Sequence, residues 1–292
     1  MFPVIAARWL APAVRWIVVH APRIAVRHQA GHFVIVRSQQ GSERIPLTIA
    51  DSDRQAGTIS LAVQVVGSST QQLCQIEVGQ SILDVVGPLG QPTEIEKLGH
   101  VVLVGGGVGT AVIHPQAKAM VAAGNKVSAI MGGRSREYVI LEEELRQICG
   151  NVYPCTDDGS YGFHGLVTKR LEQLMAAESV HGVVMAGPVP MMRAVAEVTR
   201  PHGIHTVASL NPIMVDGTGM CGGCRVMVGG KMLFACVDGP EFDAHQVDFG
   251  ELINRLSAYR EQEKLAREQT ATSEPHKCNL DRQAEQLAAK QS

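Results

Sequence analysis

The sequence lacks an apolar stretch that is long enough to cross a membrane. Its most apolar terminus, MFPVIAARWLAPAVRWIVVHAP, is interrupted by Arg8 and Arg15 and contains no small-residue cleavage site. A spanning helix needs about 18 uninterrupted apolar residues, and a secretory signal needs a continuous apolar region before its cleavage site. We therefore expect no membrane partner, and the segment predicts two strands joined by a turn at Ala11 and Pro12.

The chain also lacks a large net charge. Lysine and arginine total 26 and aspartate and glutamate total 28, which leaves a formal charge of −2 at pH 7. A strongly basic surface is the feature that attracts nucleic acid or an anionic membrane. The composition therefore predicts no nucleic-acid partner.

A disulfide framework is not expected either, because seven cysteines are an odd number for one. Cys221, Cys224 and Cys236 follow the pattern C-x2-C-x11-C in a glycine-rich segment, which is typical of soft-metal and iron–sulfur sites. Such sites usually take four protein ligands, and no fourth cysteine stands nearby. Reduced thiols at this spacing favour a cytoplasmic location. The remaining cysteines in strand or helix contexts are expected to be buried, namely Cys74, Cys149 and Cys155.

The residue pattern changes along the chain and predicts four structural regions. Residues 1–98 contain short runs rich in valine and isoleucine between glycine, proline and serine turns, as in a small β-barrel. Residues 99–208 alternate apolar strands with helical segments, as in an α/β doubly wound parallel sheet. Residues 209–250 are glycine-rich and loop-like, and residues 251–292 predict a short helix followed by a disordered tail.

A glycine-rich turn joins the first predicted parallel strand to a helix in the stretch VVLVGGGVGTAVIHP. Glycine allows a phosphate to approach the backbone there, and the helix N-terminus supplies N–H donors. The match to the Rossmann pattern is poor, because Thr110 takes the third glycine position and the next strand ends in GGRSRE without an acidic residue. A tight turn without a ligand therefore stays open. The glycines of this turn are Gly105, Gly106, Gly107 and Gly109.

Two further loops strengthen the nucleotide interpretation. TDDGSYG follows the strand NVYPC, and AGPVPMM follows the strand GVVM. Both loops lie at the carboxyl ends of predicted parallel strands, which is where ligands bind in open α/β sheets. The candidate nucleotide-binding residues of these loops and of the GGR strand end are Gly132, Arg134, Asp158, Gly159, Gly187 and Met191.

The order of these motifs resembles the ferredoxin-reductase superfamily, and within it the branch with a C-terminal [2Fe–2S] module. The stretches ERIPLTIAD, DVVGPLG, TDDGSYG and VDGTGMCGGCRV are most similar to the small (alpha) subunits of NADH-dependent ferredoxin:NADP oxidoreductases, the sulfide dehydrogenase-like type. These subunits are related to the dihydroorotate dehydrogenase electron-transfer subunit. The resemblance runs from about residue 2 to residue 258, and it implies an FAD-binding barrel, an NAD-binding α/β domain and a small [2Fe–2S] module.

The resemblance implies where the barrel binds FAD. The family's flavin motif, an Arg-x-aromatic-Ser/Thr strand, matches RIPLT without the aromatic residue. The stretch VQVVGSST is similar to the second flavin loop, and its length favours FAD over FMN, although a polar hairpin is the other interpretation. The expected FAD-binding residues are Arg44, Pro46, Leu47, Thr48, Val63, Gln64, Val65, Gly67, Ser69 and Thr70.

The resemblance also supplies a fourth cluster ligand. In the dihydroorotate branch a cysteine lies five residues before the C-x2-C pair, and here that position is Asp216. An aspartate stands at this place in the resembling small subunits. The resemblance therefore implies a [2Fe–2S] cluster held by Asp216, Cys221, Cys224 and Cys236, with a structural zinc ion on the same ligands as the alternative.

The implied function is that of an electron-transfer flavoprotein subunit. It would move electrons between NAD(H), FAD and a [2Fe–2S] cluster to a larger iron–sulfur flavoprotein subunit, with ferredoxin as a further partner. NADP(H) stays open as the nicotinamide, because Arg134 and Arg136 in GGRSRE are able to hold a 2′-phosphate. No catalytic residue is expected, because the cofactors carry the chemistry. The alternatives are the electron-transfer subunit of dihydroorotate dehydrogenase and a non-catalytic, NAD-binding redox sensor.

Overall fold

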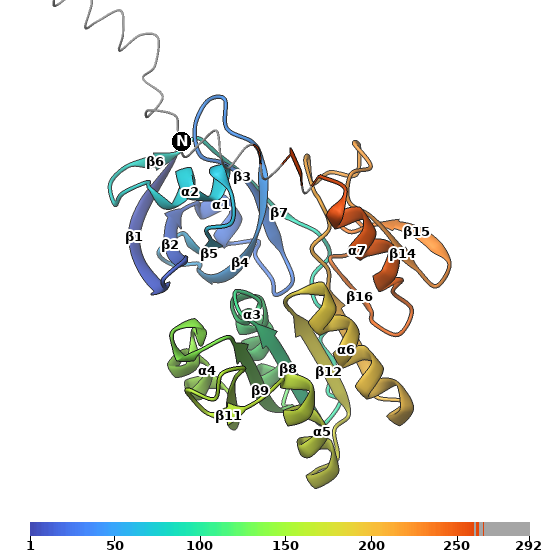
Figure 1. The fold of residues 1–292 in the computed structure, drawn as a ribbon. Helices are drawn as coiled ribbons and strands as arrows, with labels where there is room; N and C mark the ends of the chain where they lie inside the picture. Colours follow the sequence, from blue (N-terminus) through green and yellow to red (C-terminus); the bar gives the residue numbers. More distant parts are fainter. Residues whose placement is uncertain (260, 263–264, 266–292) are drawn as a thin grey trace, which may run out of the picture. The chain divides into compact units, whose positions relative to one another are not determined.

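The computed structural model describes residues 1–259, 261–262 and 265 (Figure 1). Residues 1–258 form one unit. The tail that the composition predicts to be disordered lies almost entirely outside the described residues. In the part of the chain that the structure describes, no helix is long and apolar enough to span a membrane.

The first part of the chain is an antiparallel sheet of seven strands that curls into a nearly closed barrel (Figure 1). The strand order is β6-β1-β2-β5-β4-β3-β7. The predicted pair of N-terminal strands is confirmed, because β1 and β2 form a hairpin that turns at residues 12–13. The strands are β1 (Phe2–Ala11), β2 (Val14–His20), β3 (Phe33–Arg37), β4 (Ile45–Asp53), β5 (Thr58–Gln64), β6 (Ser81–Ile82) and β7 (Asp84–Leu89).

Two short helices, α1 (Pro22–Ala25) and α2 (Ser68–Cys74), accompany the barrel. The alternative of a polar hairpin at VQVVGSST is wrong, because Gly67 is followed by helix α2. The Oγ1 atom of Thr70 accepts the backbone N–H of Gly67 at 3.0 Å. This contact satisfies a donor that a helix leaves free at its N-terminus, so the polar residues of the stretch start a helix.

The second part is the predicted doubly wound sheet, with strand order β11-β10-β9-β8-β12-β13-β16. All pairings in it are parallel except the last, β13 with β16. The parallel strands are β8 (His100–Gly106), β9 (Lys126–Gly133), β10 (Asn151–Thr156), β11 (Phe163–His164), β12 (Gly182–Ala186) and β13 (His205–Ser209). The connecting helices are α3 (Gly109–Ala122), α4 (Glu142–Ile148), α5 (Val167–Ala177) and α6 (Val189–Thr199), with single 3-10 turns η1 (Arg136–Tyr138) and η2 (Arg200–His202).

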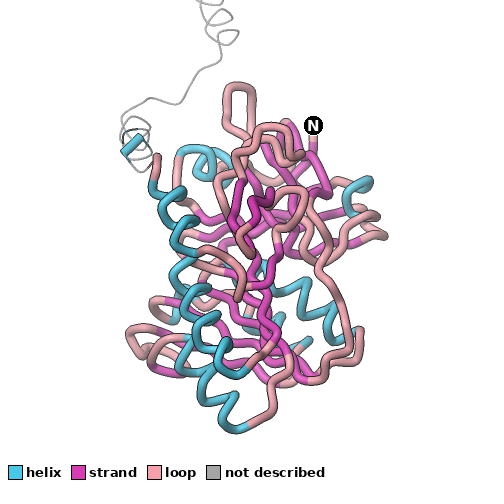
Figure 2. The backbone as a smooth tube through the Cα atoms, turned by 90° about the vertical axis from the view of Figure 1, so that its right-hand side faces the viewer, coloured by secondary structure: helices cyan, strands magenta, loops and turns pink. Residues whose placement is uncertain are grey.

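Both faces of the parallel sheet are covered by helices (Figure 2). In β8, Val101 and Leu103 belong to the core that includes α3 and α4, whereas Val102 and Val104 belong to the core that includes α5 and α6. Side chains alternate across a strand, so a strand buried on both faces is apolar at every position. This is why VVLV is an uninterrupted apolar run.

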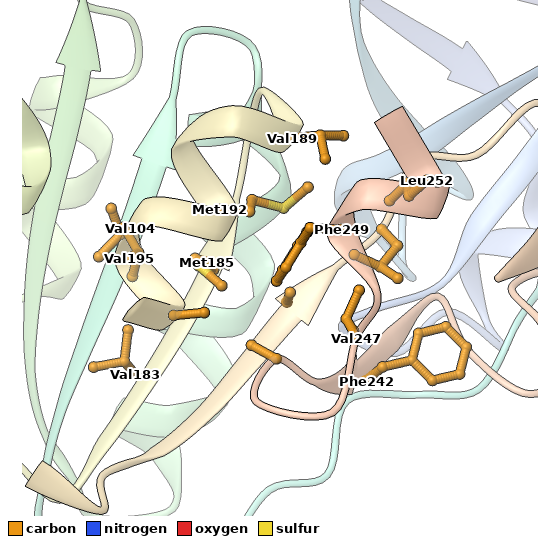
Figure 3. Close-up of a cluster of buried hydrophobic side chains, with 14 of the residues drawn as sticks. Val104, Val183, Met185, Val189, Met192, Val195, Phe242, Val247, Phe249 and Leu252 are labelled. Atoms are coloured by element: carbon orange, nitrogen blue, oxygen red, sulfur yellow. The ribbon is translucent and has the colours of Figure 1, made fainter. Parts of the chain in front are cut away.

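The cysteine-bearing part contains more regular structure than the loop-like composition predicts. It holds the hairpin of β14 (Arg225–Val228) and β15 (Lys231–Phe234), the strand β16 (Glu241–Asp243) and the helix α7 (Phe249–Ser257). Strands of three or four residues are too short to show the alternation of apolar and polar residues that predicts a strand. The hydrophobic core of the cysteine-bearing part is continuous with that of the parallel sheet, because Met192 of α6 lies beside Phe249 and Leu252 of α7 (Figure 3).

Candidate functional site

A cavity of about 750 Å³ lies where the barrel faces the carboxyl ends of the parallel strands. Strand β4 lines one side of it, and the glycine-bearing ends of β8, β9 and β12 line the other. Its size is within the range of sites for small molecules and cofactors. The predicted site residues that line it are Pro46, Leu47, Thr48, Gln64, Gly106, Gly107, Gly109, Gly132, Arg134, Gly187 and Met191.

Other predicted residues lie away from this cavity wall. Val63 is fully buried in the barrel core, and Gly105 lies behind the turn, packed against Thr110. Arg44 is exposed just before β4, and Ser69 donates a hydrogen bond to Glu43 at 3.0 Å. The residues of this group are Arg44, Val63, Val65, Gly67, Ser69, Thr70, Gly105, Asp158 and Gly159.

The barrel supplies an aromatic residue that the flavin motif lacks. Phe33 of β3 lines the cavity and pairs directly with Thr48 of β4 across the antiparallel ladder. Cross-strand partners stand side by side on one face of a sheet, so Phe33 takes a place next to the RIPLT strand that its sequence position does not suggest. A flat aromatic beside exposed strand backbone fits the ring system of a flavin.

The glycine turn after β8 is built for close approach. Gly107 has a φ of 55°, and no atom lies within 4 Å of the position that its Cβ would take. Gly109 leaves no room for a side chain, because a Cβ there would collide with the backbone of Ala186. Helix α3 starts at this turn without a side-chain cap, and Val108 and Gly109 at its start line the cavity, so the positive end of the helix dipole lies at the cavity wall. The arrangement fits a phosphate group.

The TDDGSYG loop places its two aspartates differently. Asp157 lines the cavity together with Arg134. Asp158 is exposed and accepts hydrogen bonds from the backbone N–H and the hydroxyl of Ser160, at 2.9 and 2.6 Å. These bonds lower the pKa of the Asp158 carboxyl. Asp157, which the motif alone did not single out, is therefore the aspartate of this loop that lines the ligand space.

The segment that follows β13 connects the cavity to the cysteines. It forms part of the cavity wall and then, two residues after Met214, reaches Asp216. Gly217 packs so closely on Ile35 and Leu89 of the barrel that a side chain would not fit there. The cysteine loop therefore starts against the barrel, beside strand β3, whose Phe33 lines the cavity. The wall residues of this segment are Ser209, Leu210, Asn211, Pro212 and Met214.

Asp216 folds the cysteine loop through its carboxylate. Its Oδ1 accepts the N–H of Thr218 and its Oδ2 accepts the N–H of Cys221, both at 2.9 Å. These donors lower the pKa of the carboxyl, with Thr218 the larger contributor. Asp216 is therefore ionised and adjacent to Cys221, which is exposed.

Cys224 and Cys236 form a second pair, and both are buried. The N–H of Cys236 points to the Sγ of Cys224 at 3.4 Å. Burial, followed by the hydrogen bond with Cys224, raises the pKa of Cys236 to about 12. Neighbouring buried thiols of this kind give up their protons when a metal binds.

The donor set fits a binuclear cluster. Among residues 1–259, 261–262 and 265, no three His, Cys, Asp or Glu side chains gather around one point. The donors lie as two neighbouring pairs, Asp216 with Cys221 and Cys224 with Cys236, and two pairs match two iron atoms with two protein ligands each. Positive φ angles at Gly217, Gly219 and Gly222 let the loop curve around the space between these four side chains.

Comparison with known proteins agrees with this arrangement. Residues 211–248 match the family described as the iron–sulfur cluster binding domain of dihydroorotate dehydrogenase B. The protein named dihydroorotate dehydrogenase B (NAD(+)), electron transfer subunit homolog, from Thermotoga maritima is 46% identical over 250 residues, which cover 86% of this chain and 88% of that protein. The chain belongs to the dihydroorotate dehydrogenase B electron transfer subunit family.

A solved structure extends the comparison to this family's ferredoxin-linked relatives. The structure reported as the NADH-dependent reduced ferredoxin-NADP oxidoreductase, in a study of flavin-based electron bifurcation, has a chain that is 42% identical. The match covers 93% of this chain and 98% of that one, with a TM-score of 0.88. The ferredoxin reductase in carbazole 1,9a-dioxygenase shares the fold at 18% identity and a TM-score of 0.59. The predicted resemblance and the predicted fold are confirmed.

Proposed function

We propose that the chain is an electron-transfer subunit that carries electrons from NADH through FAD and a [2Fe–2S] cluster to a larger iron–sulfur flavoprotein subunit. One observation carries the proposal: a single cavity is bordered by the RIPLT strand, by the three glycine-bearing strand ends and by the segment that leads into the cysteine loop. These are the three elements that a flavin, a nicotinamide and a cluster would need within reach of one another.

Each wall of the cavity has its own task. Strand β4 at Pro46–Thr48 and the Phe33 ring orient the flavin, while the turn at Gly107 and the start of α3 bind a pyrophosphate. Arg134 and Asp157 face the outer part of the nucleotide. When bound, FAD accepts a hydride and the cluster accepts single electrons. The chain supplies distance, orientation and exclusion of water, and no side chain needs to act as an acid or base.

The exit for electrons lies at the exposed end of the cysteine loop. Cys221 is exposed, and Met220 beside it is 88% exposed. Val215, just before Asp216, is also exposed. Large apolar side chains at the surface around a redox group suit a protein partner, because burial there shortens the transfer distance and excludes water. We place the partner subunit, and ferredoxin as the alternative acceptor, on this side.

The electron transfer subunit of dihydroorotate dehydrogenase B is the second candidate. Similarity to the Thermotoga maritima protein favours it. Asp216 favours the ferredoxin-linked type, because a carboxylate replaces a thiolate at the first ligand position. Copurification with a partner from the native organism distinguishes the two, since a dihydroorotate-oxidising partner and a ferredoxin-oxidising partner are told apart by their substrates.

The proposal is tested by anaerobic purification of the full chain. We expect one FAD, about two irons and about two sulfides per chain, and bleaching of the flavin absorbance by NADH in a stopped-flow experiment. Cys224→Ala should lose the cluster and keep FAD. Cys149→Ala is the matched control, because Cys149 is also buried but lies in the core beneath α3 and α4. Stoichiometric zinc without iron, or a chain without FAD that NADH does not reduce, would overturn the proposal.

A further inference from the structure

Two arginines grip the backbone between Cys221 and Cys224. The Nη1 atom of Arg225 donates to the carbonyl oxygen of Gly222 at 2.7 Å, and the Nη2 atom of Arg255 donates to the carbonyl oxygen of Gly223 at 3.1 Å. The two gripped peptide units are consecutive. They make up the short link between one cluster ligand and the next.

The geometry of a trans peptide gives these bonds a consequence on the opposite side. The C=O and N–H groups of one peptide point in opposite directions, so a donor that holds the oxygen also sets where the N–H points. The N–H of Gly223 belongs to the peptide whose oxygen Arg225 holds, and it points to the Sγ of Cys221 at 3.4 Å. The guanidinium also polarises the peptide and strengthens its N–H as a donor.

Arg255 reaches the loop from an element that is firmly anchored. Helix α7 is capped by Asp248, whose Oδ1 accepts the N–H of Glu251 at 2.9 Å, and Asp248 N–H donates to Met227 of β14 at 2.9 Å. Leu252 of the helix is buried in the core shared with α6 (Figure 3). The helix therefore fixes the place of the Arg255 side chain, which is only 29% exposed.

Arg255 also pairs with a carboxylate of its own helix. Glu251 Oε1 lies 3.7 Å from Arg255 Nε, while the Nη2 atom of the same guanidinium donates to the loop carbonyl of Gly223. The ion pair therefore holds the guanidinium on α7 and leaves its Nη2 atom to the loop. A cluster with cysteine and aspartate ligands is anionic, so two cations behind its loop favour the reduced form.

We propose that Arg225 and Arg255 are positioning residues that aim the peptide N–H groups of the Cys221–Cys224 loop at the cluster and thereby raise its reduction potential. The inference rests on the proposed [2Fe–2S] cluster. It assigns a role in electron transfer to helix α7, which carries Arg255. Removing either arginine should weaken N–H···S bonding and lower the potential, because such bonds stabilise the added electron.

The test compares Arg225→Met and Arg255→Met with the matched control Arg193→Met. Arg193 is an exposed arginine of α6 that pairs with Glu197 of the same helix. The measurements are the cluster potential by redox titration with EPR detection, the flavin potential of the same sample, and the rate of iron release to a chelator. We expect a lower cluster potential, altered g values and about tenfold faster iron release in both arginine variants, from loss of a charge-assisted bond. The flavin potential should stay unchanged.

Arg255→Lys separates orientation from charge. Lysine keeps the positive charge but lacks the planar fork of a guanidinium, so partial recovery of the potential is expected. An unchanged cluster potential and EPR spectrum in both Met variants would overturn the inference. So would a shift of cluster and flavin potentials together, because that outcome reports general loosening. If the unmodified chain holds no iron, the proposed function fails first, and the two failures remain distinguishable.

Discussion

Gln116 of α3 donates a hydrogen bond of 2.5 Å to Glu241 Oε1 in β16. The same oxygen accepts the hydroxyl of Thr93, in the connection between barrel and sheet, at 2.8 Å. Glu241 thus joins three parts of the chain through one carboxylate oxygen. Burial raises the pKa of its carboxyl above the ordinary value, and Gln116 Oε1 lies buried without a donor among the described residues.

Glu241→Gln should make the protein less sensitive to rising pH. A carboxyl with a raised pKa contributes stability below its unfolded-state pKa of 4.5 and loses that contribution as pH rises through the folded value. Glutamine carries no charge to bury, and its amide is able to donate to Gln116 Oε1. Melting temperatures measured from pH 4.5 to 8 should therefore fall less in the variant than in the unmodified protein. Glu172→Gln, at an exposed ion pair with Lys169, is the control and should leave the slope unchanged.

His28 predicts a loss of stability in acid. It is 7% exposed, and its Nδ1 lies 2.7 Å from Ser52 Oγ. Burial, followed by repulsion from His32, lowers its pKa from 6.5 to about 4. As pH falls, His28 therefore binds its proton in the unfolded chain before it does so in the folded chain. About 3 kcal/mol of unfolding free energy should be lost as pH falls from 6.5 to 4.

The measurement is urea denaturation of His28→Gln between pH 4 and pH 7. The variant should lose clearly less stability over this window than the unmodified protein, while His202→Gln, at an exposed position in η2, should behave like the unmodified protein. Equal acid sensitivity in all three proteins would show that other groups carry the effect.

Gly107→Ala tests the nucleotide turn against a matched position. Gly107 and Gly203 have φ angles of 55° and 61°, and neither has an atom within 4 Å of the place of a new Cβ. Alanine should cost about 1 to 2 kcal/mol of unfolding free energy at both, from left-handed backbone strain. Only Gly107 lines the cavity, so only its variant should weaken NADH binding, measured as the NADH concentration for half-maximal flavin reduction. Weaker binding in Gly203→Ala would contradict the assignment of the turn.

Asp157→Asn should relax the choice between nicotinamides. Asp157 lines the cavity together with Arg134. Its negative charge repels the 2′-phosphate of NADPH, which the arginine alone would attract. The ratio of NADPH to NADH reduction rates should rise roughly tenfold in the variant, as expected for removal of one like charge. Asp158→Asn alters the neighbouring carboxylate, which does not line the cavity and is held in its own turn, and should leave the ratio unchanged. A larger effect of Asp158→Asn would reverse the roles of the two residues.

The arrangement of the strands was predictable because it follows from local sequence patterns. The apolar run before Gly105 and the glycine loops after the parallel strands predict a parallel sheet that binds a ligand at its carboxyl edge. Phe33 was not predictable as a cavity residue, since its place depends on its register opposite Thr48. The contact of Arg255 with the cysteine loop is likewise non-local, because 32 residues separate it from Gly223. Local patterns report which face a residue takes, and not which distant segment it meets.

The last strand of the parallel sheet belongs in sequence to the cysteine-bearing part. Residues 241–243 of β16 pair with Val207, Ala208 and Ser209 of β13, so the strand closes an edge that would otherwise display free N–H and C=O groups. A chain cut before residue 210 would carry an open apolar edge and would be prone to stick to other copies. If the cysteine-bearing part is exchanged between relatives, β16 leaves with it and a new strand has to pair with β13. The nucleotide-binding sheet is therefore completed by a strand from the part of the chain that holds the cysteines.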